Sequence, residues 1–251
     1  MSAAEIVAIA VAGFAAGAIN TLVGSGTLIT FPVLIAFGYT PVIANVSNTI
    51  GLVPGSASGA WGYRRELSGQ GARVLRLGSA ALLGGLTGAI LLLVLPSSAF
   101  KAIVPVFIAV ALVLTVAQPR IAAWLARKEI DVERHGTLLT PLAVYLTGVY
   151  GGYFGAAQGI MLLAILGVML AQDLQRTNAL KNVLAGLVNG IAGVYFVLAA
   201  HVDWGPAGLI AGSAIGGAQL GARYGRRLPP QALRAIIVVV GVFAIVRLAA
   251  G

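Results

Sequence analysis

Cysteine is absent from the 251 residues, and charged residues make up only 9% of them. Without cysteine the chain can form no disulfide, no thiolate metal site and no cysteine nucleophile. A soluble domain has about 25% charged residues, so the low charge excludes an ordinary water-soluble fold. With 59% hydrophobic residues and a mean hydropathy of +0.97, the composition indicates a membrane-embedded protein.

Carboxylates and histidines are also scarce, and their positions exclude most catalytic sites. His135 and His201 lie in predicted loops on opposite faces. The seven carboxylates lie at or near the ends of apolar segments: Glu5, Glu66, Glu129, Asp131, Glu133, Asp173 and Asp203. This distribution offers no acid–base pair, no zinc ligand set and no Walker-type phosphate loop. We therefore predict no enzyme activity, no metal and no cofactor. A cation pump is also disfavoured, because proton and cation pathways place such groups inside the membrane.

Long apolar runs fill most of the chain. They cover residues 5–22, 27–37, 42–62, 77–95, 101–117, 137–153, 160–170, 178–200, 206–222 and 233–250. Most can cross much or all of a hydrocarbon core of about 30 Å, whereas a short segment such as 27–37 reaches only about 17 Å. Each short segment is expected to pair with the segment before it as a broken or re-entrant helix. The sequence thus predicts an all-α polytopic membrane protein of about eight spans.

The most polar stretch divides the chain into two halves of similar plan. We predict a first transmembrane repeat at 1–117, a cytoplasmic linker at 118–136 and a second transmembrane repeat at 137–251. Shifting the second half back by 133 positions superposes Gly26 on Gly159, Asn45 on Asn178, and Asn48 on Lys181, without gaps. Each half then reads as a broken helix pair followed by three transmembrane helices.

Arginine and lysine set the expected orientation. The net charge is +9, and the positive-inside rule places loops 63–76, 118–136 and 223–234 in the cytoplasm. Loops 38–43, 96–100 and 201–205 then lie outside, so equivalent loops fall on opposite faces and the two repeats are inverted. Because the positive charge serves topology, we expect membrane lipids and no nucleic acid as partners. The first apolar run has no basic residue before it, so no cleaved signal peptide is expected.

Two glycine-rich breaks precede the short segments. They are formed by Gly24, Ser25, Gly26 and Thr27 in the first half, and by residues 155–159 with Gln158 and Gly159 in the second. A helix that begins inside the membrane presents unpaired N–H groups and partial positive charge, which favour an anion. The alternative is that these glycines serve only close helix crossing.

A second polar group opens the long segments that follow. It consists of Asn45 and Asn48 in the first half, and of Asn178, Lys181 and Asn182 in the second. Residues three or four apart share a helix face, and buried amides need partners, so these faces should point into protein or a wet cavity. Lys181 would be the one positive charge there. The alternative is that Asn45 and Asn178 cap their own helices and that Lys181 snorkels to the inner surface.

Other polar residues are weaker candidates for the same site. Asn20, Tyr150, Tyr153, Asn189 and Gln219 lie within apolar segments. Each of them alone is more often an interhelical hydrogen bond than a ligand contact.

These motifs resemble a known family. Gly17-Ala-Ile-Asn20-Thr-Leu-Val-Gly24-Ser-Gly26-Thr-Leu-Ile-Thr-Phe-Pro32 and Asn45-Val-Ser-Asn48 are similar to the first repeat of the sulfite exporter TauE/SafE transporters. Gly148-Val-Tyr-Gly-Gly-Tyr-Phe-Gly155, Thr177-Asn-Ala-Leu-Lys-Asn182 and Gly216-Gly-Ala-Gln-Leu-Gly-Ala-Arg223 are similar to the second. The resemblance implies a plasma-membrane permease for small sulfur-containing anions such as sulfite, thiosulfate or organosulfonates.

The pattern as a whole predicts a secondary transporter of a small anion in the bacterial cytoplasmic (inner) membrane. Inverted repeats with broken helices place the site at the repeat interface and work by alternating access. The alternatives are a passive anion channel and a non-catalytic membrane assembly subunit, and a homodimer is left open. Electrical recording in planar bilayers separates a channel from a transporter, because a channel needs a continuous wet path.

Overall fold

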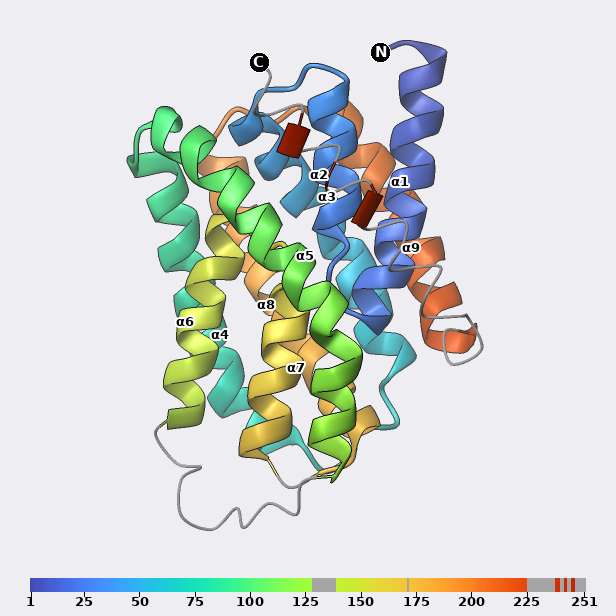
Figure 1. The fold of residues 1–251 in the computed structure, drawn as a ribbon, viewed down its shortest axis with the longest axis vertical. Helices are drawn as coiled ribbons and strands as arrows, with labels where there is room; N and C mark the ends of the chain where they lie inside the picture. The colour runs from blue at the N-terminus through green and yellow to red at the C-terminus, as the bar shows by residue number, and fades with distance from the viewer. Residues whose placement is uncertain (128–138, 171, 225–237, 240–241, 243–244, 247–251) are drawn as a thin grey trace.

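The computed structural model describes residues 1–127, 139–170 and 172–224, together with residues 238, 239, 242, 245 and 246. These residues form helices and no strand (Figure 1). The helices are α1 (Ala3–Leu22), α2 (Thr27–Ala36), α3 (Pro41–Gly62), α4 (Gly71–Val94), α5 (Ser97–Arg127), α6 (Leu139–Tyr153), α7 (Gln158–Met169), α8 (Leu174–Ala199) and α9 (Trp204–Tyr224). The all-α class expected from the sequence is thereby confirmed.

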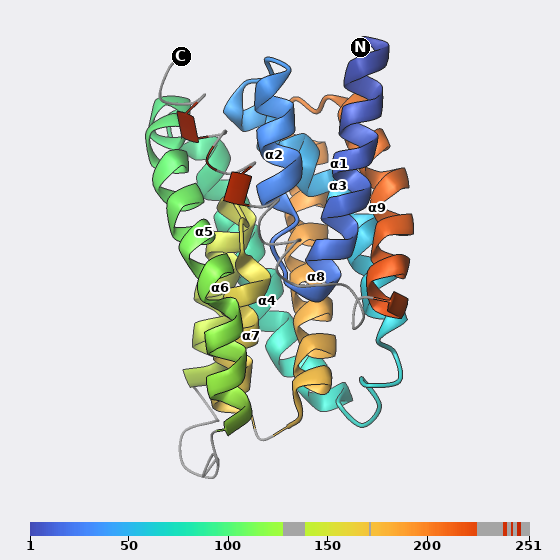
Figure 2. The same ribbon diagram turned by 45° about the vertical axis from the view of Figure 1, so that its right-hand side comes forward.

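The first broken helix pair is α1 with α2. A capping box between Ser2 and Glu5 starts α1, and the chain turns back through Gly24, whose φ of +86° suits glycine. The ten residues of α2 rise only about 15 Å and cannot cross a membrane alone. In Figures 1 and 2, α1 runs from the end of the molecule that holds the N-terminus towards the middle, and α2 returns towards that end.

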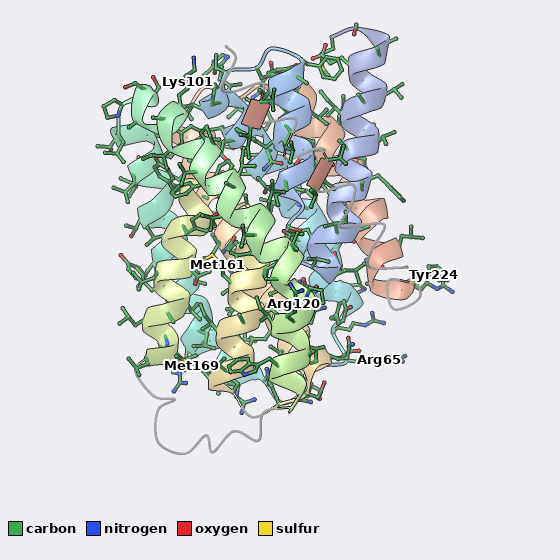
Figure 3. All side chains as sticks on the ribbon, in the orientation of Figure 1. Arg65, Lys101, Arg120, Met161, Met169 and Tyr224 are labelled. Atoms are coloured by element: carbon green, nitrogen blue, oxygen red, sulfur yellow. The ribbon has the colours of Figure 1, made fainter. Side chains whose placement is uncertain are left out.

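The second broken helix pair is α6 with α7. Gly155 and Ala157 have positive φ values of 78° and 59° and separate the two helices. The 15-residue α6 and the 12-residue α7 enter from the end opposite to the N-terminus, as Figure 2 shows. Met169, the last residue of α7, lies near that end in Figure 3. The two broken pairs therefore reach the middle of the molecule from opposite ends.

Four described helices are long and apolar enough to cross a membrane: α1, α4, α8 and residues 97–121 of α5. Their outer faces carry large apolar side chains that no described residue covers. Leu75, Leu83, Val94, Val113 and Leu198 are 62–81% exposed. Such a surface is unfavourable in water and suits lipid. The chain is a multi-pass membrane protein.

Close helix packing rests on glycines. α4 packs mainly on α6, and α9 packs on α1 and α3. A Cβ on Gly88 of α4 would lie 2.0 Å from the carbonyl oxygen of Val149, and a Cβ on Gly217 of α9 would lie 1.8 Å from that of Phe14. No side chain fits at either crossing.

The loops gather at two ends. At one end the Tyr39 hydroxyl donates to Glu5 Oε1 at 2.6 Å, and the backbone N–H of Asp203 donates to Ser47. Burial raises the pKa of Tyr39, and the bond to the carboxylate raises it further, so the hydroxyl stays a donor.

At the other end Arg176 donates to the carbonyl oxygen of Ser68 at 2.8 Å, and Arg73 donates to Gln172 at 2.9 Å. In Figure 3, Lys101 lies towards the first end and Arg65 towards the second.

Several predicted bounds need correction. α4 begins at Gly71 and not at 77, and α5 continues past 117 to Arg127, because helices extend beyond their apolar part into the polar interface. α8 begins at Leu174, where Asp173 accepts from the N–H groups of Gln175 and Arg176. Asn45 and Asn178 therefore lie inside helices, and the idea that they cap their own helices is wrong. Most of the predicted segment 233–250 lies outside the described residues.

Candidate functional site

The two chain breaks touch each other. The backbone N–H of Gly159 donates to the carbonyl oxygen of Gly24 at 3.0 Å. A Cβ on Gly24 would lie 2.3 Å from the Cα of Gly159, and one on Gly159 would lie 2.4 Å from the Cα of Gly24. Only glycine at both positions allows this contact between segments 135 positions apart.

The contact involves Gly24, whereas the sequence pattern had paired Gly26 with Gly159. Gly26 precedes α2, and a Cβ there would meet the carbonyl oxygen of Ala16 at 2.6 Å, within its own helix pair. The left-handed turn at Gly24 explains the shift, because it presents that residue towards α7 and folds Gly26 back onto α1. The N–H of Gly159 already donates to the carbonyl oxygen of Gly24, so an anion could bind that N–H only after the two glycines separate.

Unpartnered buried polar atoms belong to the breaks and to the side chains that bind the adjoining helix ends. Among the described residues these are Ser25 Oγ, Asn45 Oδ1, Tyr153 OH, Gln158 Nε2 and Asn178 Oδ1, and all five side chains are buried. Ser25 and Gln158 belong to the breaks, Tyr153 ends α6, and the two asparagines bind the helix ends next to the breaks. A buried polar atom without a partner is costly, so these side chains are suited to receive a polar ligand or water.

α8 binds the end of α1. The Nζ of Lys181 donates to the carbonyl oxygens of Asn20 and Thr21, both at 3.2 Å. Asn178 and Asn182 also donate to the carbonyl oxygen of Thr21, at 3.3 and 3.2 Å. These groups satisfy the carbonyls that a helix end leaves unpaired. Lys181 is 0% exposed, so the snorkelling alternative is wrong.

α3 binds the end of α6 in the same way. Asn45 donates to the carbonyl oxygen of Tyr153, the last residue of α6, at 3.0 Å. One turn later, Asn48 donates to the hydroxyl of Thr27 at 3.3 Å and accepts from the hydroxyl of Thr30, and both threonines lie on α2. Asn45 of α3, in the first half, thus binds the end of α6 in the second half, and Asn178 of α8, in the second half, binds the end of α1 in the first half.

An aromatic group closes one side of the breaks. Phe154 lies edge-on to Phe31 of α2, with ring centroids 5.2 Å apart, and contacts Phe100 and Phe107 of α5. The phenol ring of Tyr153 packs on the same two α5 phenylalanines. Sequence reasoning missed these phenylalanines, since apolar residues in apolar segments give no separate signal.

Apart from Tyr153, the weaker candidates lie away from the breaks or have other partners. Asn20 and Asn189 both donate to the hydroxyl of Ser56 at 3.4 Å, a shared acceptor that sequence reasoning also missed. The Tyr150 hydroxyl donates to the carbonyl oxygen of Ala156 at 2.5 Å, next to the second break. Gln219 donates to Ser58 on an exposed face and is an interhelical hydrogen bond.

The chemistry of the region is that of a neutral, donor-rich site with one lysine amine, that of Lys181. In the part of the chain that the structure describes, no cluster of three His, Cys, Asp or Glu side chains could hold a metal ion. A polar centre enclosed by long apolar helices, two of them broken, is typical of membrane transport proteins.

Comparison with known proteins identifies the family. The sequence profile of the sulfite exporter TauE/SafE family matches residues 9–248, so the chain belongs to this family. The resemblance drawn from the glycine and asparagine motifs is confirmed, and the protein is a membrane transporter.

Curated relatives carry transporter names. The "Probable membrane transporter protein ORF9" of a Sinorhizobium species is 29% identical over 248 residues, covering 96% of this chain and 90% of the relative. The "Probable membrane transporter protein YfcA" of Escherichia coli K12 is 25% identical over 214 residues, covering 85% and 76%. A Haemophilus influenzae "Probable membrane transporter protein" is 24% identical over 211 residues, covering 84% and 81%. No solved structure matches the chain significantly.

Proposed function

We propose that the protein is a secondary transporter that moves a small anion, of the sulfur oxyanion or organosulfonate class, across the bacterial inner membrane. The anion binds where the two chain breaks meet. The observation that carries this proposal is the contact between Gly24 and Gly159, with unpartnered buried polar atoms in and beside the breaks and the buried amine of Lys181 on the end of α1.

The inverted-repeat arrangement, with repeats at 1–117 and 137–251 joined by 118–136, draws support from matched contacts. The offset of 133 carries Gly84 and Gly88 of α4 to Gly217 and Gly221 of α9. The first pair packs against carbonyl oxygens of α6, and the second pair against carbonyl oxygens of α1. The same offset carries Asn45 to Asn178, and each binds the end of the opposite broken helix.

An anion is the substrate class that the donors favour. The hydroxyls of Ser25 and Tyr153 and the amide nitrogen of Gln158 are unpartnered donors, and Lys181 adds a charge. Both short helices, α2 and α7, begin at the breaks, so their positive dipole ends face the same place. Sulfur oxyanions and sulfonates are small, and their several oxygen acceptors match this set of donors.

Transport by alternating access then requires the breaks to open. In the closed arrangement the carbonyl oxygen of Gly24 occupies the N–H of Gly159. An anion that takes this N–H replaces the interhelical hydrogen bond with a charge-assisted one, which is roughly twice as strong. The substrate would thus separate the two breaks as it binds.

Uptake by purified protein in liposomes tests the proposal. Radiolabelled sulfite, thiosulfate and methanesulfonate are offered outside, with protein-free liposomes as the control. We expect uptake of at least one anion and faster uptake when the same unlabelled anion is trapped inside, since exchange is a property of a transporter. Uptake without this stimulation, together with unitary currents in planar bilayers, would indicate a passive channel. A protein that neither binds nor moves any anion would favour a non-catalytic assembly subunit.

A further inference from the structure

Charge is nearly absent around the breaks. The sequences of α2, α3, α6 and α7 contain no Asp, Glu, Lys, Arg or His. α1 contains only Glu5, in its first turn at the far end, where it accepts from Tyr39. α8 contains Arg176 in its first turn, where it donates to Ser68 in the loop before α4. Lys181 is thus the one charged side chain that these helices place next to the breaks.

The remaining elements do not change this balance. α4 contributes Arg73 and Arg76, which lie in its first two turns. α5 contributes Lys101 near its start, the exposed Arg120 about two turns before its end, and Arg127 as its last residue, and α9 contributes Arg223 in its last turn. Among the described residues, no carboxylate contacts Lys181.

The partners of Lys181 offset its charge only in part. Both acceptors, the carbonyl oxygens of Asn20 and Thr21, are neutral groups in the last turn of α1. A helix C-terminus provides about half a negative charge. The side chain is 0% exposed, so water contributes little. A buried lysine without a counter-charge is favoured in its protonated form only beside an anion, so a bound substrate would supply the charge that pairs with Lys181.

We infer that the site selects a singly charged anion and discriminates against dianions. This inference rests on the proposed function and names its substrate class by charge. One negative charge beside Lys181 gives a neutral buried pair, whereas a dianion leaves one negative charge uncompensated among apolar helices.

Isothermal titration of the purified protein with methanesulfonate and sulfate tests this selection. Both are tetrahedral about sulfur, and neither changes its charge near neutral pH. We expect methanesulfonate to bind at least about tenfold more tightly at equal ionic strength. Lys181→Met keeps the aliphatic stem and removes the amine, and it should weaken the binding of methanesulfonate by a similar factor. Lys101→Met removes an exposed lysine near one end of the molecule (Figure 3) and should change neither affinity.

Sulfate is also the more costly ion to dehydrate, so a third variant isolates the effect of charge. Asn48 aligns with Lys181 by the repeat offset, is 1% exposed and contacts Thr27 at the start of α2. Asn48→Lys adds a second charge and should shift the preference towards sulfate by about tenfold or more. Size-exclusion chromatography tests whether each variant is folded. If Asn48→Lys does not fold, the effect of charge is judged from Lys181→Met alone.

The outcomes separate the two proposals. Sulfate binding as tight as methanesulfonate binding, or an unchanged methanesulfonate affinity in Lys181→Met, would overturn the inference. Transport restricted to dianions would overturn it too, while the proposed function would stand. A reconstituted protein that moves no anion of either charge would overturn the proposed function itself.

Discussion

The contact between Gly24 and Gly159 makes a quantitative prediction for the variant Gly24→Ala. The added Cβ would lie 2.3 Å from the Cα of Gly159, about 1.1 Å short of the 3.4 Å at which ordinary contact begins. The two breaks must therefore move apart by about this distance, because both atoms belong to rigid backbone. The 3.0 Å hydrogen bond between them lengthens by a similar amount and is lost.

The expected cost combines three effects. Overpacking costs about 1–3 kcal/mol, a side chain at a left-handed φ costs about 1–2 kcal/mol, and the lost hydrogen bond costs about 1 kcal/mol. Together these lower the free energy of unfolding by about 3–6 kcal/mol. Gly38 is a matched control, since its φ is +89° and nothing lies within 4 Å of an added Cβ. Gly38→Ala should cost only the backbone strain, about 1–2 kcal/mol.

Thermal unfolding in detergent and initial uptake rates in liposomes provide the measurement. Gly24→Ala should unfold at a clearly lower temperature than Gly38→Ala and should lose uptake, while Gly38→Ala keeps it. Gly159→Ala has helical backbone angles and should lose uptake without the strain contribution. If Gly24→Ala matched Gly38→Ala in both stability and uptake, the breaks would not be in contact and the site would have to be placed elsewhere.

Three further predictions concern the ends of the molecule and the helix caps. Because the chain has no cysteine, Asp203→Cys should react with an impermeant reagent from outside only, and Ser68→Cys from inside only; labelling of both from one side would refute the orientation. Asn45→Ala leaves the carbonyl oxygen of Tyr153 without its donor and should lower the free energy of unfolding by about 1–3 kcal/mol in chemical denaturation. Tyr39→Phe removes the 2.6 Å hydrogen bond to α1 and should cost about 1 kcal/mol with anion affinity unchanged, so weaker binding would tie this end to the site.

Hydropathy and glycine spacing predicted most of the local structure. The breaks at Gly24 and Gly155 appear where short apolar segments begin, since a segment too short to cross must fold back. The start of α4 at Gly71 and the end of α5 at Arg127 were missed, because hydropathy marks the apolar part of a helix and not its hydrogen-bonded ends.

The partners across the two halves could not be predicted. Sequence reasoning selected Asn45, Asn178 and Lys181 as buried polar residues, but it assigned their donors to a ligand or to their own helix ends. Their acceptors are carbonyl oxygens at the ends of α6 and α1, and every residue has such a carbonyl. The residue types of Thr21 and Tyr153 do not indicate that their carbonyl oxygens accept these hydrogen bonds. Long-range backbone acceptors follow from the packing of whole helices, which one sequence does not contain.

This crossed arrangement bears on which parts move. A helix of each half packs on the broken helix pair of the other half. α9 packs on α1 and α4 packs on α6, with glycines against carbonyl oxygens. Separating the halves as rigid bodies would break both packings, whereas moving α2 and α7 about the breaks would leave them intact.

A disulfide between α1 and α9 distinguishes the two movements. A Cβ on Gly13 would lie 2.2 Å from the hydroxyl oxygen of Ser213 and 3.0 Å from the Cα of Ile210, so Gly13→Cys requires α1 and α9 to shift slightly apart. After that shift, the double variant Gly13→Cys and Ser213→Cys brings two thiols close enough to bond. We expect the oxidised protein to transport at the same rate as the reduced protein, because the fastened surfaces move together. Transport that is lost on oxidation and returns on reduction would show that α1 and α9 must part, and would assign the movement to the repeats as whole bodies.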